Sequence, residues 1–173
     1  MNGKILDAIN EQIKWELYSS YLYLSMSAWY DSIGLRGFSH WERIQAMEER
    51  DHAMKFYDYV LSRGGIIELQ AIDAPPSLWE SPPEKAFEYQ YEHEQSVTAK
   101  IDNLVELAHE EHDHATYNLL QWFVDEQVEE EENARTILEK LSMASDEMGM
   151  NILFMVDKEL AARGYHPLVT PDY

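Results

Sequence analysis

The sequence contains no cysteine, which excludes disulfides, thiolate zinc sites, iron–sulfur clusters and cysteine nucleophiles. Basic residues are also few: 13 Lys and Arg stand against 33 Asp and Glu, and the formal net charge is −20. This balance argues against nucleic-acid and anionic membrane partners, and it is compatible with attracting metal cations. No uncharged apolar run reaches the roughly 18 residues of a membrane span, and the N-terminus lacks the apolar core of a signal peptide. We therefore expect a soluble, cytoplasmic protein.

Helical periodicity dominates the chain, whereas the period-2 alternation typical of strands is missing. The pattern predicts long helices over about 4–31 and 35–63, a third after the cap Ser81 to about Glu111, and a fourth from there to about Met143. A short fifth helix is expected over about 151–163. The stretch "GGIIELQAIDAPPSLWESPPE", with its four prolines, is long enough to travel the length of a bundle. We expect one all-α domain over 1–173, a four-helix bundle with one long crossover.

A core-facing helix carries apolar residues at steps of three or four, and one carboxylate interrupts each of the four expected stripes. These carboxylates, with a histidine three residues after the second and a glutamine three residues before the fourth, are Glu16, Glu49, His52, Glu94, Gln127 and Glu130. The acidic run "DEQVEEEEN", residues 125–133, is therefore split. Glu130 is expected inside the bundle, whereas Glu131 and Glu132 belong to a solvated face.

The four stripes contain no Lys or Arg, so four converging carboxylates would repel one another unless a cation joined them. Two divalent ions would neutralise the four charges and leave His52 as a neutral nitrogen ligand. Oxygen-rich ligation with one imidazole suits iron or manganese better than copper, and zinc also fits. The pattern predicts a di-metal site, although buried carboxylates held for structural reasons are the alternative.

At these residues the chain resembles the non-haem ferritins of bacteria and archaea. The resemblance is carried by "WELYSSYLYLSMSAWY", "EERDHAMKFYDYV", "YEHEQSVTAKI" and "LLQWFVDEQVEEEENA", and it covers about residues 4–143. It implies a ferritin-like bundle that oxidises Fe(II) with O2 or H2O2 at an intra-subunit ferroxidase centre. It also implies storage of the iron as ferric mineral in a hollow homo-oligomeric cage, a 24-mer.

The resemblance assigns roles to individual residues of this sequence. By that assignment, ligands of the first iron are Glu16, the bridging Glu49 and His52, ligands of the second are Glu94 and Glu130, Gln127 lies beside them, and a third iron is bound by Glu48, Glu126 and Glu129. Tyr23 would be an electron donor near the centre, and Trp122 a neighbouring aromatic. The third-site acids could instead be surface acids, and the two aromatics could be ordinary core residues.

Two departures from related families shape the expected cofactors. Bacterioferritins carry a haem-ligating Met directly after the bridging Glu, and Arg50 stands at that position, so no haem is expected. The fourth helix has Gln127-x-x-Glu130 in place of a second Glu-x-x-His, which, with the lack of cysteine, counts against a rubrerythrin-type peroxidase. The cluster "HEEHDH", His109–His114, is either a solvated turn or a metal-binding group.

Three functions remain open at this stage. They are iron storage with ferroxidase activity, a non-storage di-iron oxidase or peroxidase on the same bundle, and a non-enzymatic interaction protein with only surface acids. The carboxylates on the core stripes argue against the third. A storage protein must form a large hollow assembly, whereas an oxidase needs only a small oligomer.

Overall fold

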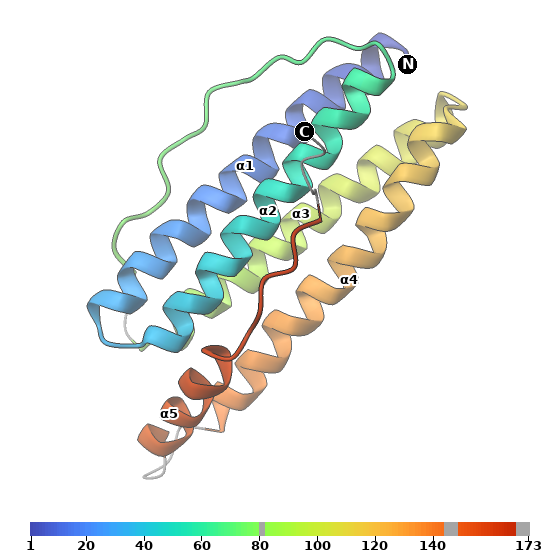
Figure 1. Cartoon of the computed structure of the whole chain (residues 1–173). Coiled ribbons are helices and arrows are strands. Elements are labelled where there is room, and N and C mark those ends of the chain that lie inside the picture. The colour runs from blue at the N-terminus through green and yellow to red at the C-terminus, as the bar shows by residue number, and fades with distance from the viewer. Residues whose placement is uncertain (80–81, 144–148, 169–173) are drawn as a thin grey trace.

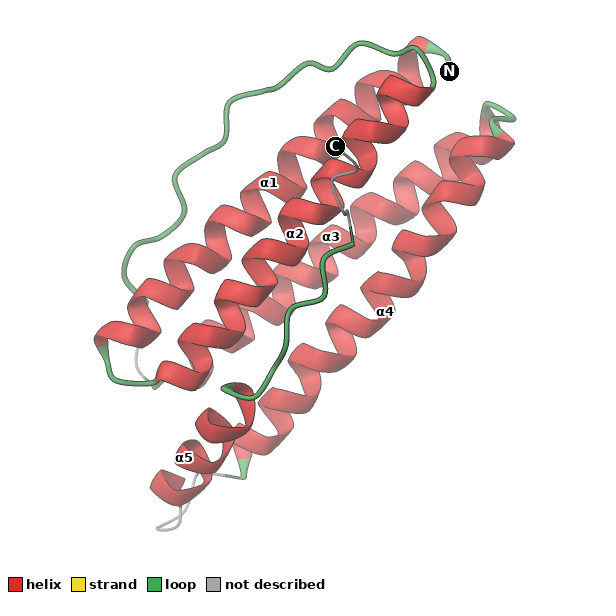
Figure 2. Ribbon diagram, in the orientation of Figure 1, coloured by secondary structure: helices red, strands yellow, loops and turns green. Residues whose placement is uncertain are grey.

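The computed structural model describes residues 1–79, 82–143 and 149–168 (Figure 1). All regular structure in these ranges is helical, and the figure shows red helices joined by green loops (Figure 2). The helices are α1 (Gly3–Ser32), α2 (Arg36–Ser62), α3 (Glu84–Glu110), α4 (His114–Ser142) and α5 (Gly149–Leu160). The predicted four-helix bundle with one long crossover is thus confirmed, and the expected helix boundaries are correct to within a few residues. Ser81, the expected cap of α3, lies outside the described residues.

Short turns join α1 to α2 and α3 to α4, and glycines close α1 and α2. Gly34 and Gly64 have φ angles of +86° and +68°, a left-handed conformation that side chains other than glycine adopt at a cost. Two side chains cap helix N-termini, those of α1 and α4. Asn2 accepts a hydrogen bond from the Ile5 amide, and Asp113 accepts one from the Thr116 amide.

The crossover between α2 and α3 runs along the outer side of α1 (Figure 1). Asn10 fixes it near its start: its Nδ2 donates to the Ile66 carbonyl at 3.1 Å, and its Oδ1 accepts from the Glu68 amide at 3.1 Å. The Ser25 hydroxyl donates to the Pro76 carbonyl further along. These bonds satisfy backbone groups of a segment that has no secondary structure of its own.

The apolar core forms two clusters, one in each half of the bundle. One cluster contains Tyr30, Phe38 and Phe87, and the other contains Phe56 and Phe123, whose rings stack with centroids 3.9 Å apart. The buried polar residues of the four stripes lie along the sequence between the members of the two clusters. The bundle therefore has a polar layer across its middle, held on both sides by packed apolar side chains.

Helix α5 is held to the start of α2 by Asp157. Its Oδ1 accepts hydrogen bonds from the Gly37 and Phe38 amides at 2.7 and 3.1 Å, a carboxylate at a helix N-terminus. The approach is so close that a Cβ at position 37 would lie 1.6 Å from the Asp157 carbonyl oxygen. None of the described helices is long and apolar enough to cross a membrane.

Candidate metal centre

One half of the polar layer is a group of three donors from α1 and α2. Glu16, Glu49 and His52 each offer a ligand atom, and these atoms lie within 4.8 Å of one another. All three side chains are buried, with exposed fractions of 1%, 2% and 1%. His52 Nδ1 is 3.5 Å from a Glu49 carboxylate oxygen and 4.0 Å from one of Glu16. The i, i+3 spacing of Glu49 and His52 puts both on the same face of α2.

The other half is supplied by α3 and α4. Glu94 and Glu130 are buried, with exposed fractions of 1% and 4%. Glu94 accepts hydrogen bonds from the Tyr23 hydroxyl and, at 3.3 Å, from the side-chain amide of Gln127. All six stripe residues predicted from the sequence are therefore buried in the interior of the bundle, whereas their roles as iron ligands stay predictions.

Neutral donors orient the carboxylates of this layer. Gln12 Nε2 donates to Glu16 at 2.8 Å, and Gln45 Nε2 donates to Glu130 at 2.7 Å. Such partners fix a carboxylate's direction without a positive charge that would compete with a metal ion. Neither role was predicted from the sequence. Gln45 lies on the core stripe of α2, and Gln12 precedes Glu16 by one helical turn, so the signal was present in the helical spacing.

Burial and neighbouring charges shift the pKa values of several groups in this layer. Burial, followed by the neighbouring charge of Glu130, raises the pKa of Glu94 to about 8. Burial also raises the pKa of Glu49, against the opposing effect of His52. Burial lowers the pKa of His52, but Glu49 and Glu126 outweigh it and leave that pKa well above its usual value. Carboxylates and an imidazole that hold protons in this way would release them to a divalent cation.

Long side chains span the space between α2 and α4. Among the described residues, no Cα atom of α2 comes within 8 Å of one of α4. The two helices meet through Gln45 and Glu130, through His52 and Glu126, and through the stacked rings of Phe56 and Phe123. This separation leaves room for carboxylates to face one another across the middle of the bundle.

The three acids expected at the third site are placed differently from one another. Glu48 pairs with Arg163, with 2.5 Å between Oε2 and Nη2. Glu126 lies 3.7 Å from His52 Nε2, and Glu129 is exposed. Within the described part of the chain these three acids do not converge as Glu16, Glu49 and His52 do.

The two aromatic residues singled out in the sequence both touch this layer. Tyr23 is fully buried, and burial, followed by the charge of Glu94, raises the pKa of its hydroxyl well above the usual value. The ring of Trp122 lies edge-on to that of His52, with centroids 5.5 Å apart, and the Lys55 ammonium sits 3.9 Å from the Trp122 centroid.

The expectation of one carboxylate on each stripe is wrong for α2. Glu42 is fully buried, and neither of its oxygens has a hydrogen-bond partner in the described residues. Trp41, one position earlier on α2, is only partly buried. The apolar arc of a helix is more than 100° wide, so the pattern alone could not decide which of two successive positions points inward.

The four core stripes carry no basic residue, but a basic residue from another segment does reach the layer. Arg163, which follows α5, brings a guanidinium to the side of α2, although the sequence predicted residue 163 as the end of the fifth helix. In the structure α5 ends at Leu160, and the chain then turns back along α2 (Figure 1). This contact was missed because nothing in the periodicity of a tail tells where it goes.

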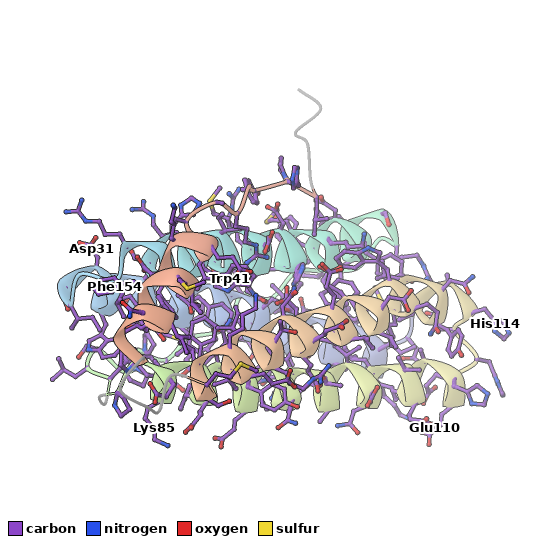
Figure 3. The ribbon with its side chains drawn as sticks, turned by 90° about the horizontal axis from the view of Figure 1, so that it is seen from below. Asp31, Trp41, Lys85, Glu110, His114 and Phe154 are labelled. Atoms are coloured by element: carbon purple, nitrogen blue, oxygen red, sulfur yellow. The ribbon has the colours of Figure 1, made fainter. Side chains whose placement is uncertain are left out.

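The cluster His109–His114 lies at the α3–α4 turn, at the end of the bundle where Figure 3 labels Glu110 and His114. Two of its three acids pair with other residues: Glu111 pairs with Lys4 at 2.5 Å and Asp113 with Arg63 at 3.1 Å. His109, His112 and His114 are exposed. These features favour a solvated turn over a metal-binding group.

The chain is similar to known proteins over most of its length. The model of the Ferritin-like domain family matches residues 6–144. A bacterial non-heme ferritin of Bacteroides fragilis is 44% identical over 163 residues, which cover 94% of this chain and 99% of that protein. One of Staphylococcus saprophyticus is 41% identical over 165 residues, 95% of this chain and 97% of that protein.

Solved structures agree with the curated relatives. A ferritin of the hyperthermophilic archaeon Archaeoglobus fulgidus, described as a novel open-pore ferritin, is 52% identical with a TM-score of 0.91, covering 95% of this chain and 99% of that one. A humanized archaeal ferritin is 53% identical with a TM-score of 0.93, covering 96% and 99%.

Proposed function

Because the chain belongs to the ferritin family, we propose that it oxidises Fe(II) to Fe(III) in the polar layer of its bundle before the iron is stored. Iron storage itself follows from the ferritin relatives, which match nearly the whole chain, and from the buried Glu16, Glu49 and His52 group. The chain is an iron-storage ferritin. A non-storage oxidase or peroxidase is not favoured, since the relatives reported above are named as ferritins.

The observation that supports an oxidation centre is the burial of these donors on core stripes that carry no Lys or Arg. Glu16, Glu49 and His52 would hold one Fe(II), and Glu94 and Glu130 a second, with Glu49 between them. Four carboxylates balance the charge of two divalent ions. Paired metals in enzymes usually lie about 3–4 Å apart, which one bridging carboxylate can span.

The proposed reaction balances with dioxygen as oxidant. Each of two Fe(II) ions loses one electron, and O2 takes up the two electrons and two protons and leaves as hydrogen peroxide. Hard carboxylate oxygens favour the more highly charged Fe(III). The two iron positions would be unequal, because His52 serves one of them and only carboxylates serve the other.

The Fe(III) product would then move to a third position and on to a mineral inside a shell. Glu48, Glu126 and Glu129 are proposed to bind the third iron on its way, and Tyr23 to supply an electron to the centre. The assembly is a homo-oligomer, and we propose the 24-subunit cage of the family. The net charge of −20 per chain would favour cation entry and mineral nucleation.

The proposal is tested by aerobic loading with a large excess of Fe(II), removal of free iron by size exclusion, and measurement of iron per chain at the protein's elution volume. We expect a large particle that holds far more iron than the two or three ions of the proposed sites. Two or three ions per chain in a small oligomer would contradict storage and leave a di-iron enzyme.

A matched pair of variants assigns the oxidation to the polar layer. Glu130→Gln replaces a buried ligand, whereas Glu132→Gln changes an exposed acid on the same helix. We expect only the first to slow the absorbance rise of Fe(III) with two Fe(II) per chain. Equal rates in both variants would mean that oxidation takes place elsewhere.

A further inference from the structure

The guanidinium of Arg163 reaches the edge of the polar layer from outside the four-helix bundle. Its Nη1 donates to the side-chain oxygen of Gln45, and its Nη2 lies 2.5 Å from Glu48 Oε2. Its central carbon is 3.9 Å from the centroid of the Trp41 ring. Figure 3 labels Trp41, which lies where α2 meets α5. The guanidinium is thus bound on two edges and stacked on one face.

Of the two residues that Arg163 binds, one contacts a proposed iron ligand and the other is itself a proposed iron ligand. Gln45 uses its amide nitrogen to hold Glu130, a proposed ligand of the second iron. Glu48 precedes the bridging Glu49 and is a proposed ligand of the third iron. Arg163 therefore contacts both the polar layer, through Gln45, and the proposed third iron site, through Glu48.

The segment that carries Arg163 is fixed on both sides. Before it, Asp157 binds the first amides of α2 at Gly37 and Phe38. After it, the Tyr165 hydroxyl donates to Asp51 at 2.5 Å, and the Leu168 amide donates to the same carboxylate oxygen at 3.1 Å. These contacts span α2 from its first turn to its middle, so the position of Arg163 does not depend on its own interactions alone.

Arg163 and Glu48 form an ion pair in which each side chain is 17% exposed. A fixed positive charge at this place neutralises Glu48 and repels a metal ion that would bind there.

We propose that Arg163 is a positioning residue that controls the third iron site, because its guanidinium occupies Glu48 and a third cation binds only by displacing it. Displacement of Arg163 also breaks its hydrogen bond to Gln45. Because Gln45 donates to Glu130, filling of the third site would then alter the position of Glu130. This inference rests on the proposed two-iron centre and concerns only the step after it. If the third site fills only after the two-iron centre, both iron ions stay in the centre until they are oxidised.

The test uses zinc, which binds similar ligands without redox chemistry. Metal-free assembled protein is titrated calorimetrically with Zn(II), in the wild type, Arg163→Gln and Arg163→Lys. In Arg163→Gln we expect the third equivalent to bind about tenfold more tightly or better, since a like charge a few Å away is lost. Arg163→Lys keeps the charge and should stay close to the wild type. Lys158→Gln removes an exposed positive charge of α5 and should leave all three affinities unchanged.

The outcomes separate the two proposals. Absence of two tight sites in the wild type, with slow Fe(II) oxidation, would contradict the proposed function itself. Two tight sites with equal third-site affinity in the wild type and Arg163→Gln would overturn the role of Arg163. Equal tightening in Arg163→Gln and Arg163→Lys would also overturn it, because the charge would then be irrelevant.

A second variant covers the case in which Arg163→Gln does not assemble. Asp157→Ala leaves Arg163 intact but removes the carboxylate that holds α5 to α2. The guanidinium is then less firmly placed, and we expect the third Zn(II) to bind several-fold more tightly. An unchanged third affinity in this variant, with α5 shown to be loosened by faster amide exchange, would contradict the proposal.

Discussion

The hydroxyl of Tyr23 on α1 donates a hydrogen bond to the carboxylate of Glu94 on α3, across the centre of the bundle. Both side chains are almost fully buried. The bond links the α1–α2 pair to the α3–α4 pair at the level of the proposed iron centre. It gives Tyr23 a structural role that holds whether or not this residue also donates an electron.

Tyr23→Phe should therefore lower the free energy of unfolding of the metal-free protein and slow iron oxidation only modestly. Loss of the donor leaves Glu94 with the longer bond from Gln127, at a cost of about 1–2 kcal/mol in the free energy of unfolding. Chemical denaturation and stopped-flow Fe(II) oxidation measure the two effects. Tyr21→Phe, at an exposed position on the same helix, is the control. A much larger loss of rate than of stability would support a direct electron-transfer role.

Glu94→Ala should slow rapid Fe(II) oxidation strongly while the chain stays folded. The variant removes a proposed ligand of the second iron, and changes around metal ligands commonly cost 10–100-fold, so we expect about 100-fold or more. Glu92→Ala changes an exposed acid two residues away and should oxidise Fe(II) normally. A normal rate in Glu94→Ala, measured with two Fe(II) per chain, would remove Glu94 from the centre.

Stability of the metal-free protein should fall as the pH rises from about 5 to about 8. The pKa of Glu94 is raised from 4.5 to about 8 in the folded state, so the folded chain binds more protons than the unfolded chain over this range. The contribution is complete below about pH 4.5 and is lost as the pH approaches 8. The raised pKa values of Glu49 and His52 act in the same direction.

Thermal unfolding in the presence of a chelator, followed by circular dichroism, measures this slope. Glu94→Gln should flatten it, because the titrating group is gone. Saturating Zn(II) should reverse it, since the metal binds the deprotonated ligands and competes with protons. A midpoint that rises with pH in the metal-free wild type would show that the layer is ionised without metal.

The sequence was sufficient for the fold and for the burial of the six predicted stripe residues because both depend on helical spacing. Steps of three and four place Glu16, Glu49, Glu94 and Glu130 on faces that also carry the core residues, and the long proline-containing stretch determines the connectivity. These are local properties of the chain. They do not depend on knowing how distant segments meet.

The contacts that the sequence could not reveal involve either fine helical rotation or long-range approach. Glu42 lies next to Trp41 at the edge of the apolar arc, where one step of rotation exchanges the inner and outer residue. Arg163 meets Gln45 and Glu48 more than a hundred residues away in sequence, through a tail without periodicity. The close approach of Gly37 to Asp157 likewise depends on where α5 docks.

Gly37→Ala should displace α5 and destabilise the protein. The added Cβ would lie 1.6 Å from the Asp157 carbonyl oxygen, so α5 must shift and the two hydrogen bonds to Asp157 Oδ1 weaken. Overpacking of this kind costs about 1–3 kcal/mol. Hydrogen exchange should show faster exchange in Gly149–Leu160. Gly3→Ala adds a Cβ with nothing within 4 Å and serves as the control. Unchanged protection of α5 in Gly37→Ala would mean that the contact does not hold it.

Glu42→Met should make the metal-free protein more stable. The carboxyl is fully buried and unpartnered in the described residues, and burial raises its pKa well above the usual value despite the attraction of Arg163. A flexible apolar side chain of similar length removes this cost and fills the same space, for an expected gain of about 1–3 kcal/mol in the free energy of unfolding. Glu42→Gln keeps a polar group without partners and should gain less, and Glu132→Met, at an exposed position, should change little. Denaturant unfolding of the four proteins decides the matter. A loss of stability in Glu42→Met would mean that the carboxyl makes a favourable interaction in solution, and its influence on Glu94 and Glu130 would then be the first thing to measure.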